Sequence, residues 1–259
     1  MEYLVVKLGG ELIEDPDQVK IIADGILDKQ KAGYKIVVVH GGGTQINDWC
    51  ERLHIPVKKF YGRRVTDRPT MEVMQAVVAG VVNPNLVSLL RKYGVTAAGL
   101  TGADANLTTS SKRKPLTYGE ETIDFGLIGE IESVDISYVN LLTDNKITPV
   151  ISCLTWSENE GIMNINADTL ARKIAGALGN SELALISGVP GVYDHNNTTL
   201  KTLSRSEWQQ GVETGWITTG MQPKLENGFA ALDEGATSVV ITNPEGWASS
   251  LGTRLIPDK

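Results

Sequence analysis

The sequence has few of the residues that build disulfide-linked or metal-centred proteins. Its 259 residues include two cysteines, Cys50 and Cys153, which form no CxxC pair. Two cysteines this far apart argue against a disulfide framework and against a cysteine zinc site. The three histidines, His40, His54 and His195, are scattered along the chain, which argues against a histidine metal cluster. We therefore expect no metal held by protein ligands alone.

Long apolar runs and an excess of basic residues are also missing. The longest apolar runs, such as residues 36–39, fall far short of the ~20 residues that a membrane helix needs. The N-terminus, MEYLVVKLGG, lacks the basic and apolar regions of a signal peptide. The net charge of −7 disfavours nucleic acid as a partner. We expect a cytoplasmic protein with neither nucleic acid nor a membrane as a partner.

The residues that are present fit an α/β protein. Apolar residues make up 41% and charged residues 21% of the chain, which excludes a disordered protein or a fibre. Short β-rich runs alternate with helical patterns, and this alternation indicates right-handed crossovers and a mostly parallel sheet covered on both faces. The expected strands are 4–8, 35–40, 95–100, 147–154, 182–188 and 237–242, and the expected helices are 16–32, 43–55, 70–92, 135–145, 167–178, 205–213 and 223–234.

Two stretches depart from the alternation. Residues 58–66 and 125–135 are typical of hairpins or short antiparallel strands at one edge of the sheet. No repeat or free linker is visible, so we expect a single domain, 1–259, with two lobes that meet near residues 165–180.

Lys7 is the first residue that looks costly for a purely structural role. It lies near the end of a strand expected to be covered on both faces, where an ammonium must lose water unless an anion meets it. The alternative is that its side chain reaches solvent from the strand end. Gly9 and Gly10 follow it, and they would let another group approach the backbone at the edge where ligands bind in open α/β sheets.

A second glycine run, 41–43, follows the next strand and begins a helix. Helix N-termini bind anions, although a tight strand-to-helix turn explains the run equally well. The run matches neither the P-loop pattern nor the dinucleotide fingerprint. In the expected hairpin, Arg63 or Arg64 could hold a carboxylate, but a solvated basic pair is the simpler interpretation.

Two further segments combine a helix start with residues of possible chemical use. Lys224 follows Pro223 in a helix's first turn, where a lysine opposes the helix dipole unless an anion lies nearby or solvent screens it. In the segment MNINAD, Asn166 fits an N-cap and Asp168 the first turn. Asp168 could also orient a lysine.

In their order and spacing, these segments resemble the amino-acid kinase family, and within it the N-acetylglutamate kinases. The resemblance spans essentially the whole chain. The matching blocks are VVKLGG (5–10), VVVHGGG (37–43), GRRVTD (62–67), MNINAD (163–168), LISGVPGVYD (185–194), GWITTGMQPKL (215–225) and GTRL (252–255).

The resemblance implies a three-layer αβα sandwich with an N-lobe (about 1–170) for the acylated amino acid and a C-lobe (about 171–259) for the nucleotide. It implies ATP-dependent phosphorylation of the side-chain carboxylate of N-acetyl-L-glutamate to an acyl phosphate, the second step of arginine biosynthesis. The cofactors would be ATP and nucleotide-bound Mg²⁺. We also expect a homodimer, because arginine-inhibited hexamers of this family carry an extra N-terminal helix and the first expected strand lies too near the N-terminus to allow one.

Matching positions also imply residue roles. Lys7 and Lys224 would be the transition-state lysines, and Asp168 would organise them. The acylated amino acid would be bound by Gly42, Gly43, Asn164 and Arg64, the last gripping its α-carboxylate. The nucleotide pocket would be lined by Gly9, Gly10, Gly188, Val189, Pro190, Gly191, Val192, Tyr193, Trp216, Ile217 and Thr218.

One position departs from the family, and several alternatives stay open. Gly188 stands where the family commonly has an aspartate, which leaves the detail of nucleotide binding undecided. The acyl group cannot be read from the sequence, so N-succinylglutamate remains an alternative, as do aminoadipate, aspartate and carbamate. A non-catalytic regulator that binds the nucleotide and the amino acid is a third reading. An NAD-dependent oxidoreductase is disfavoured because the dinucleotide fingerprint is missing.

Overall fold

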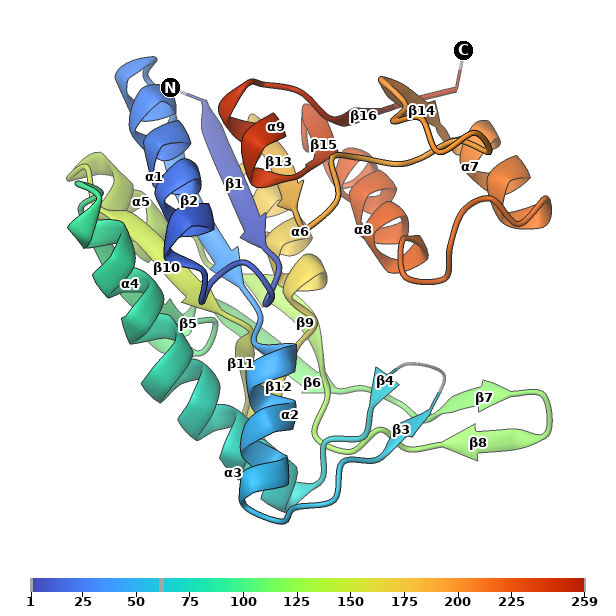
Figure 1. Ribbon diagram of the computed structural model, residues 1–259. Coiled ribbons are helices and arrows are strands. Elements are labelled where there is room, and N and C mark those ends of the chain that lie inside the picture. The colour runs from blue at the N-terminus through green and yellow to red at the C-terminus, as the bar shows by residue number, and fades with distance from the viewer. Residues whose placement is uncertain (1, 61–62, 259) are drawn as a thin grey trace.

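The computed structural model describes residues 2–60 and 63–258, and its centre is an eight-stranded sheet (Figure 1). The strand order is β14-β16-β15-β13-β1-β2-β10-β5, and neighbours are parallel except β15 and β16. The strands are β1 (Tyr3–Leu8), β2 (Lys35–His40), β5 (Ala97–Thr101), β10 (Thr148–Ser152), β13 (Ser181–Ile186), β14 (Thr202–Ser204), β15 (Ser238–Thr242) and β16 (Thr253–Ile256). The expected α/β class and mostly parallel sheet are therefore confirmed.

Helices cover both faces of this sheet, which gives three layers. On one face, α1 (Pro16–Lys31) packs against α4 (Asn83–Lys92) and α9 (Pro244–Ala248). On the other face lie α5 (Ser137–Asp144), α6 (Ala167–Leu178) and α8 (Gln222–Asp233). The remaining helices are α2 (Gly43–Arg52), α3 (Arg68–Val77), α7 (Arg205–Glu213) and a 3-10 turn, Asp104–Asn106.

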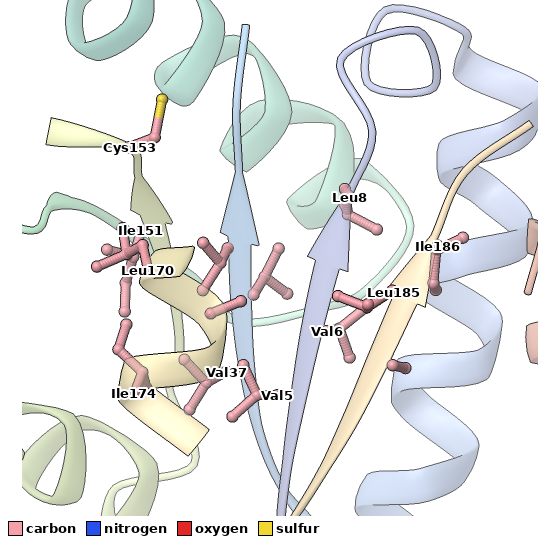
Figure 2. Close-up of a cluster of buried hydrophobic side chains, with 14 of the residues drawn as sticks. Val5, Val6, Leu8, Val37, Ile151, Cys153, Leu170, Ile174, Leu185 and Ile186 are labelled. Atoms are coloured by element: carbon pink, nitrogen blue, oxygen red, sulfur yellow. The ribbon is translucent and has the colours of Figure 1, made fainter. Parts of the chain in front are cut away.

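The core lies between the sheet and these two helix layers. Strands β1, β2 and β13 are almost continuous runs of branched apolar residues, as expected for strands buried on both faces. Figure 2 shows Leu170 and Ile174 of α6 beside Val37 of β2, so α6 is fixed against the middle of the sheet.

A second, four-stranded sheet corrects the sequence-based expectation for two segments. Its order is β12-β11-β6-β9, with β6 (Thr108–Lys112), β9 (Gly129–Val134), β11 (Leu154–Ser157) and β12 (Gly161–Asn164). Residues 125–135 therefore supply an antiparallel strand, as expected, but β9 belongs to this separate sheet and not to an edge of the large one. The expected strand 147–154 breaks at Cys153, where the chain leaves the large sheet and enters the small one.

Two short hairpins extend from the same side of the molecule (Figure 1). One pairs β3 (Lys59–Phe60) with β4 (Arg63–Arg64), which confirms the hairpin expected within 58–66, although residues 61 and 62 lie outside the described residues. The other pairs β7 (Leu116–Tyr118) with β8 (Glu121–Ile123) and was missed, because its strands are too short and polar to show a clear alternation.

The helix expected at 70–92 runs from Arg68 to Lys92 through a π-helical turn, Val78–Val82. Pro84 follows this turn, and since proline has no backbone N–H, the regular α-helical bond cannot form there. By length and composition alone this helix could cross a membrane, but 44% of its most apolar window is buried inside the protein. The helix contributes Met74, Val78 and Leu86 to the core, which accounts for its apolar composition.

Candidate active site

A cavity of about 740 Å³ opens at the carboxyl ends of β1 and β2. It extends between the N-termini of α2 and α6, the start of α8 and the segments that carry the two hairpins. Its lining includes Lys7, Gly10, Gly42, Gly43, Arg64, Asn164 and Asp168. Residues from four distant parts of the chain that the sequence singled out therefore meet in one cavity, at the edge where open α/β sheets bind ligands.

Lys7 and Asp168 form a buried ion pair in this cavity. The Nζ of Lys7 lies 2.8 Å from Oδ1 of Asp168, and each side chain is only 9% exposed. Asp168 reaches this position because Asn166 caps α6 by accepting a hydrogen bond from the Thr169 N–H, so that the first turn points toward the end of β1. The carboxylate offsets the cost of burying the ammonium and keeps a cation at the strand end.

The two glycine turns lie against each other. A side chain on Gly10 would come within 3.5 Å of the Gly43 N, and Gln45 Nε2 donates a 2.9 Å hydrogen bond to the Gly10 carbonyl. The N-terminus of α2, capped by Gly42 without any side chain, lies beside them. Gly42 and Gly43 line the cavity, and the free N–H groups at this helix start favour anions.

Arg64 is anchored at the same helix start. Its Nη2 donates hydrogen bonds to the Gly43 carbonyl (3.0 Å) and to Asn47 Oδ1 (2.7 Å), and burial lowers its pKa. Its Nη1 is buried and has no hydrogen-bond partner among the described residues. A buried guanidinium N–H without a partner fits a carboxylate ligand.

Asn164 ends β12 on the opposite wall of the cavity. Its Nδ2 donates a hydrogen bond to Thr66 Oγ1 (3.1 Å), which ties β12 to the segment after β4. Its side-chain oxygen remains an acceptor that could receive an amide N–H. Asn164 and Arg64 therefore line the same cavity.

Lys224 does not join the Lys7–Asp168 pair in the structure. It lies in the first turn of α8 and is half-buried, and its neighbours Pro223 and Glu226 line the cavity. Within the described residues Lys224 is not part of the lining and makes no ion pair. The hydrogen bond from Thr169 Oγ1 to Asn227 Oδ1 (3.1 Å) holds α8 against α6, so Lys224 borders the cavity.

The expected nucleotide segment lies at the carboxyl end of β13, outside this cavity. The N–H of Gly188 donates to Oε1 of Glu11 (3.3 Å), so a carboxylate already lies on one of the groups expected to bind phosphate. Glu11 was not singled out from the sequence, where one exposed glutamate gives no signal.

The other expected nucleotide residues anchor this region to the C-terminal part of the sheet. Val192 N–H donates to Thr253 Oγ1 (2.8 Å), and a side chain on Gly191 would lie 2.5 Å from that oxygen. Trp216 and Ile217 fill the space beside Gly211. The remaining members of the set, Gly9, Val189, Pro190, Tyr193 and Thr218, do not line the cavity either.

His40 lies directly behind the glycine turn and was considered from the sequence only as a metal ligand. It is fully buried, and burial lowers its pKa to about 4. Its Nδ1 lies 2.7 Å from the Gly41 carbonyl and its Nε2 2.9 Å from Asn83 Nδ2. The neutral ring therefore donates through Nδ1 and accepts from Asn83, and it fixes the backbone from which the turn begins.

The donor set of the site fits phosphate better than a protein-held metal. In the described parts of the chain, no group of three histidine, cysteine, aspartate or glutamate residues could hold an ion. The cavity instead carries lysine and arginine side chains and glycine N–H groups, which bind phosphoryl oxygens. These residues fit ATP, and Mg²⁺ would reach such a site on the phosphates.

Comparisons with known proteins identify the family of this chain. Residues 2–243 match the family model described as the amino acid kinase family. The chain is 39% identical to a Sorangium cellulosum protein named acetylglutamate kinase, covering 98% of this chain and 94% of that one. It is 37% identical to a Methanopyrus kandleri protein of the same name, with 96% and 98% covered.

A solved structure shares the fold. The carbamate kinase from Giardia lamblia bound to AMP-PNP superposes with a TM-score of 0.70 at 17% identity, covering 99% of each chain. This similarity concerns the fold alone, whereas the family model and the relatives cover almost the whole sequence. The chain therefore belongs to the amino acid kinase family of phosphotransferases, whose members use ATP.

Proposed function

We propose that this protein phosphorylates the side-chain carboxylate of an N-acylated L-glutamate with ATP, forming an acyl phosphate and ADP. The observation that carries the proposal is the buried Lys7–Asp168 pair, which faces the same cavity as the partnerless Nη1 of Arg64. The Lys7 ammonium suits a transferring phosphoryl group, and the Arg64 guanidinium suits the α-carboxylate of an amino acid. The relatives named acetylglutamate kinase support N-acetyl-L-glutamate as the reference substrate.

The chemistry needs no general base. A glutamate carboxylate has a pKa near ~4.3, so it is already an anionic nucleophile at neutral pH. His40 is not available as a base, because it is buried and both of its ring nitrogens are engaged. Cys153 lines the cavity, but burial raises its thiol pKa to about 11, so it is not a nucleophile there.

The chain's own groups would act by positioning and by charge. Arg64 and Asn164 would orient the acylated amino acid so that its side chain points toward Lys7. Lys7 would stabilise the charge that builds on the transferring phosphoryl group, and N–H groups of the glycine turns would bind its oxygens. Asp168 would keep the Lys7 ammonium in place. ATP supplies the phosphoryl group, and its Mg²⁺ would neutralise the outer phosphates.

Other predictions from the sequence remain part of the proposal. The N-lobe, about 1–170, would bind the amino acid, and the C-lobe, about 171–259, would bind the nucleotide through the segments at 188–193 and 216–218. We place the enzyme in the cytoplasm, in arginine biosynthesis. We also propose a homodimer, and a hexamer detected by light scattering would contradict it.

The deciding experiment measures ADP release and traps the acyl phosphate with hydroxylamine. The purified protein receives Mg²⁺-ATP and, separately, N-acetyl-L-glutamate, aminoadipate, aspartate or carbamate. We expect a hydroxamate and equimolar ADP with the acylated glutamate and little with the others. Calorimetric binding of ATP and acylglutamate without ADP release would instead support a non-catalytic regulator. The matched pair Lys7→Ala and Lys20→Ala assigns the activity to this cavity, because Lys20 lies exposed on α1.

A further inference from the structure

Three arginines gather on the wall of the cavity that carries the hairpins. Arg63 lies in β4, Arg113 follows β6, and Arg172 lies on α6 one turn after Asp168. Burial lowers the pKa of Arg113, and the positive charges of Arg63 and Arg172 lower it further. Arg63 and Arg172 thus each lie close enough to Arg113 to repel it, although the three residues come from distant parts of the sequence.

The protein neutralises this arginine cluster only in part. Six basic and three acidic side chains line the cavity, and one of the acids, Asp168, is already paired with Lys7. Arg63 and Arg113 make no ion pair or side-chain hydrogen bond within the described residues, and Glu130 is the acid that attracts Arg113. Arg172 lies 3.4 Å from Glu234, which also pairs with Lys173 at 2.8 Å.

The anions of an N-acetylglutamate substrate do not account for the cluster. Such a substrate has two carboxylates, of which one is the nucleophile near Lys7 and the other suits Arg64. The phosphates of the nucleotide would lie toward the ends of β1 and β13, where Gly188 already binds a carboxylate. The cluster adjoins the hairpins instead, where Figure 1 places β3, β4, β7 and β8 on one side of the molecule.

The surroundings of the cluster suit a short apolar chain with a charged end. Leu116, Phe125 and Ile128 line the same wall as Arg63 and Arg113. Methylene groups of a ligand can pack against such side chains, while a terminal carboxylate accepts charge-assisted hydrogen bonds from the guanidinium groups. Arg63 and Leu116 belong to the two hairpins, whereas Arg113 lies between β6 and β7, and Phe125 and Ile128 lie between β8 and β9.

We propose that the acyl group of the substrate is dicarboxylic, as in a succinyl group, and that Arg113 and Arg63 bind its free carboxylate. Arg172 completes the positive wall from α6. This inference rests on the proposed function and names the substrate class within it. Recognition of a third carboxylate would make these arginines specificity-determining residues, because a neutral acyl group leaves their charges unpaired.

The test compares substrates that differ only at the end of the acyl chain. ADP release is measured with N-succinyl-L-glutamate, with its terminal carboxamide analogue of the same length, and with N-acetyl-L-glutamate. We expect kcat/KM for the succinyl substrate to exceed that for the carboxamide at least about tenfold, as for other charge-assisted contacts. Arg113→Gln and Arg63→Gln should each reduce this ratio several-fold, whereas Arg91→Gln, on the exposed end of α4, should leave the ratio unchanged.

Each other outcome overturns the inference in a recognisable way. Equal use of the carboxylate and carboxamide substrates, or turnover of N-acetyl-L-glutamate alone, refutes the acyl assignment and leaves the proposed function intact. A rise in KM for ATP in Arg113→Gln, with an unchanged substrate ratio, assigns the cluster to the nucleotide. ADP release with none of the acylglutamates refutes the proposed function itself. If one variant does not fold, the substrate ratio in the wild type and the other variant still decide.

Discussion

Lys7 illustrates how a single buried charge identifies a site. Its ammonium has lost most of its water, and its partner is the Asp168 carboxylate in the first turn of α6, 2.8 Å away. A pair of this kind is weak evidence for stability, because the desolvation cost of both ions offsets much of their attraction. Its position at a strand end, beside glycine turns, is better explained by an anion that arrives with the substrate.

Lys7→Ala should reduce kcat at least about 100-fold, as the loss of one preorganised donor does elsewhere. The fold should persist, because the side chain ends in a cavity rather than in the core. Steady-state ADP release measures the effect, with Lys20→Ala as the control. Wild-type turnover in a folded Lys7→Ala protein would remove this residue from the mechanism.

Arg64→Ala should raise KM for the acylated amino acid far more than KM for ATP. The guanidinium is held by Gly43 and Asn47 with one N–H left over, so its removal affects the carboxylate that would bind there. Initial rates with each substrate varied in turn measure the two constants. Equal increases in both would refute the role, and Arg91→Ala on the exposed end of α4 is the matched control.

His40 should make the stability of the protein fall in mild acid. Its folded pKa, about 4, lies below the ordinary value of 6.5, so between these pH values the unfolded chain binds a proton that the folded chain does not. The free energy of unfolding should therefore drop by about 2 kcal/mol from pH 7.5 to pH 5. Denaturant unfolding at both pH values measures the drop.

The control for this prediction is the exposed His195. His40→Gln should lose most of the pH-dependent drop, whereas His195→Gln should keep it. A drop of the same size in His40→Gln would show that other groups, such as the aspartates with lowered pKa, cause it.

At the scale of elements, most of the large sheet and its helices could be predicted, but strands β14 and β16 of that sheet and the whole small sheet could not. Runs such as residues 35–40 are apolar throughout because helices cover both faces, and that pattern survives in the sequence. Strand β6, by contrast, consists of threonine, serine and lysine, and the buried hydroxyls of Thr108 and Ser110 are each hydrogen-bonded to the Thr155 hydroxyl of β11. Nothing local in such a strand distinguishes it from a loop.

The site likewise contains residues that the sequence could predict and residues that it could not. Lys7, Arg64, Asn164 and Asp168 lie in recognisable blocks, and the structure brings them together. Arg113 and Arg172 lie in no such block, and only the folding of β6 and α6 around the cavity makes them neighbours. Their proximity depends on long-range topology, which spacing along the chain does not encode.

Gly191→Ala should loosen the segment after β13 from β16. The new Cβ would lie 2.5 Å from Thr253 Oγ1, which accepts from the Val192 N–H and donates to the Leu200 carbonyl. We expect a loss of about 1–3 kcal/mol of stability, as for other overpacked sites, and a higher KM for ATP. Thermal unfolding and ATP titration check this, and Gly80→Ala, which has open space around it, is the control. An unchanged KM for ATP would separate this segment from the nucleotide.

At the scale of the whole molecule, the proposed reaction would use groups from both ends of the chain. Lys7 comes from the first strand, whereas Lys224 comes from α8, which packs on α6 near the C-terminal strands (Figure 1). The cavity reaches Pro223 and Glu226 on either side of Lys224 without including it. A rotation of this one side chain, or a small approach of α8 when the phosphates bind, would bring the second ammonium to the transferring group.

Lys224→Ala therefore tests whether Lys224 and Lys7 act on the same phosphoryl group. We expect kcat to fall at least about 100-fold, as for Lys7→Ala, with little change in KM for the amino acid. The double variant should be scarcely slower than either single variant, because groups that act on one transition state show non-additive losses. ADP release is measured for the wild type, the two single variants and the double variant, which together form a double-mutant cycle. Lys201→Ala, at an exposed lysine, is the control. Wild-type kcat in Lys224→Ala, or losses that multiply fully in the double variant, would mean that the two lysines do not serve one phosphoryl group.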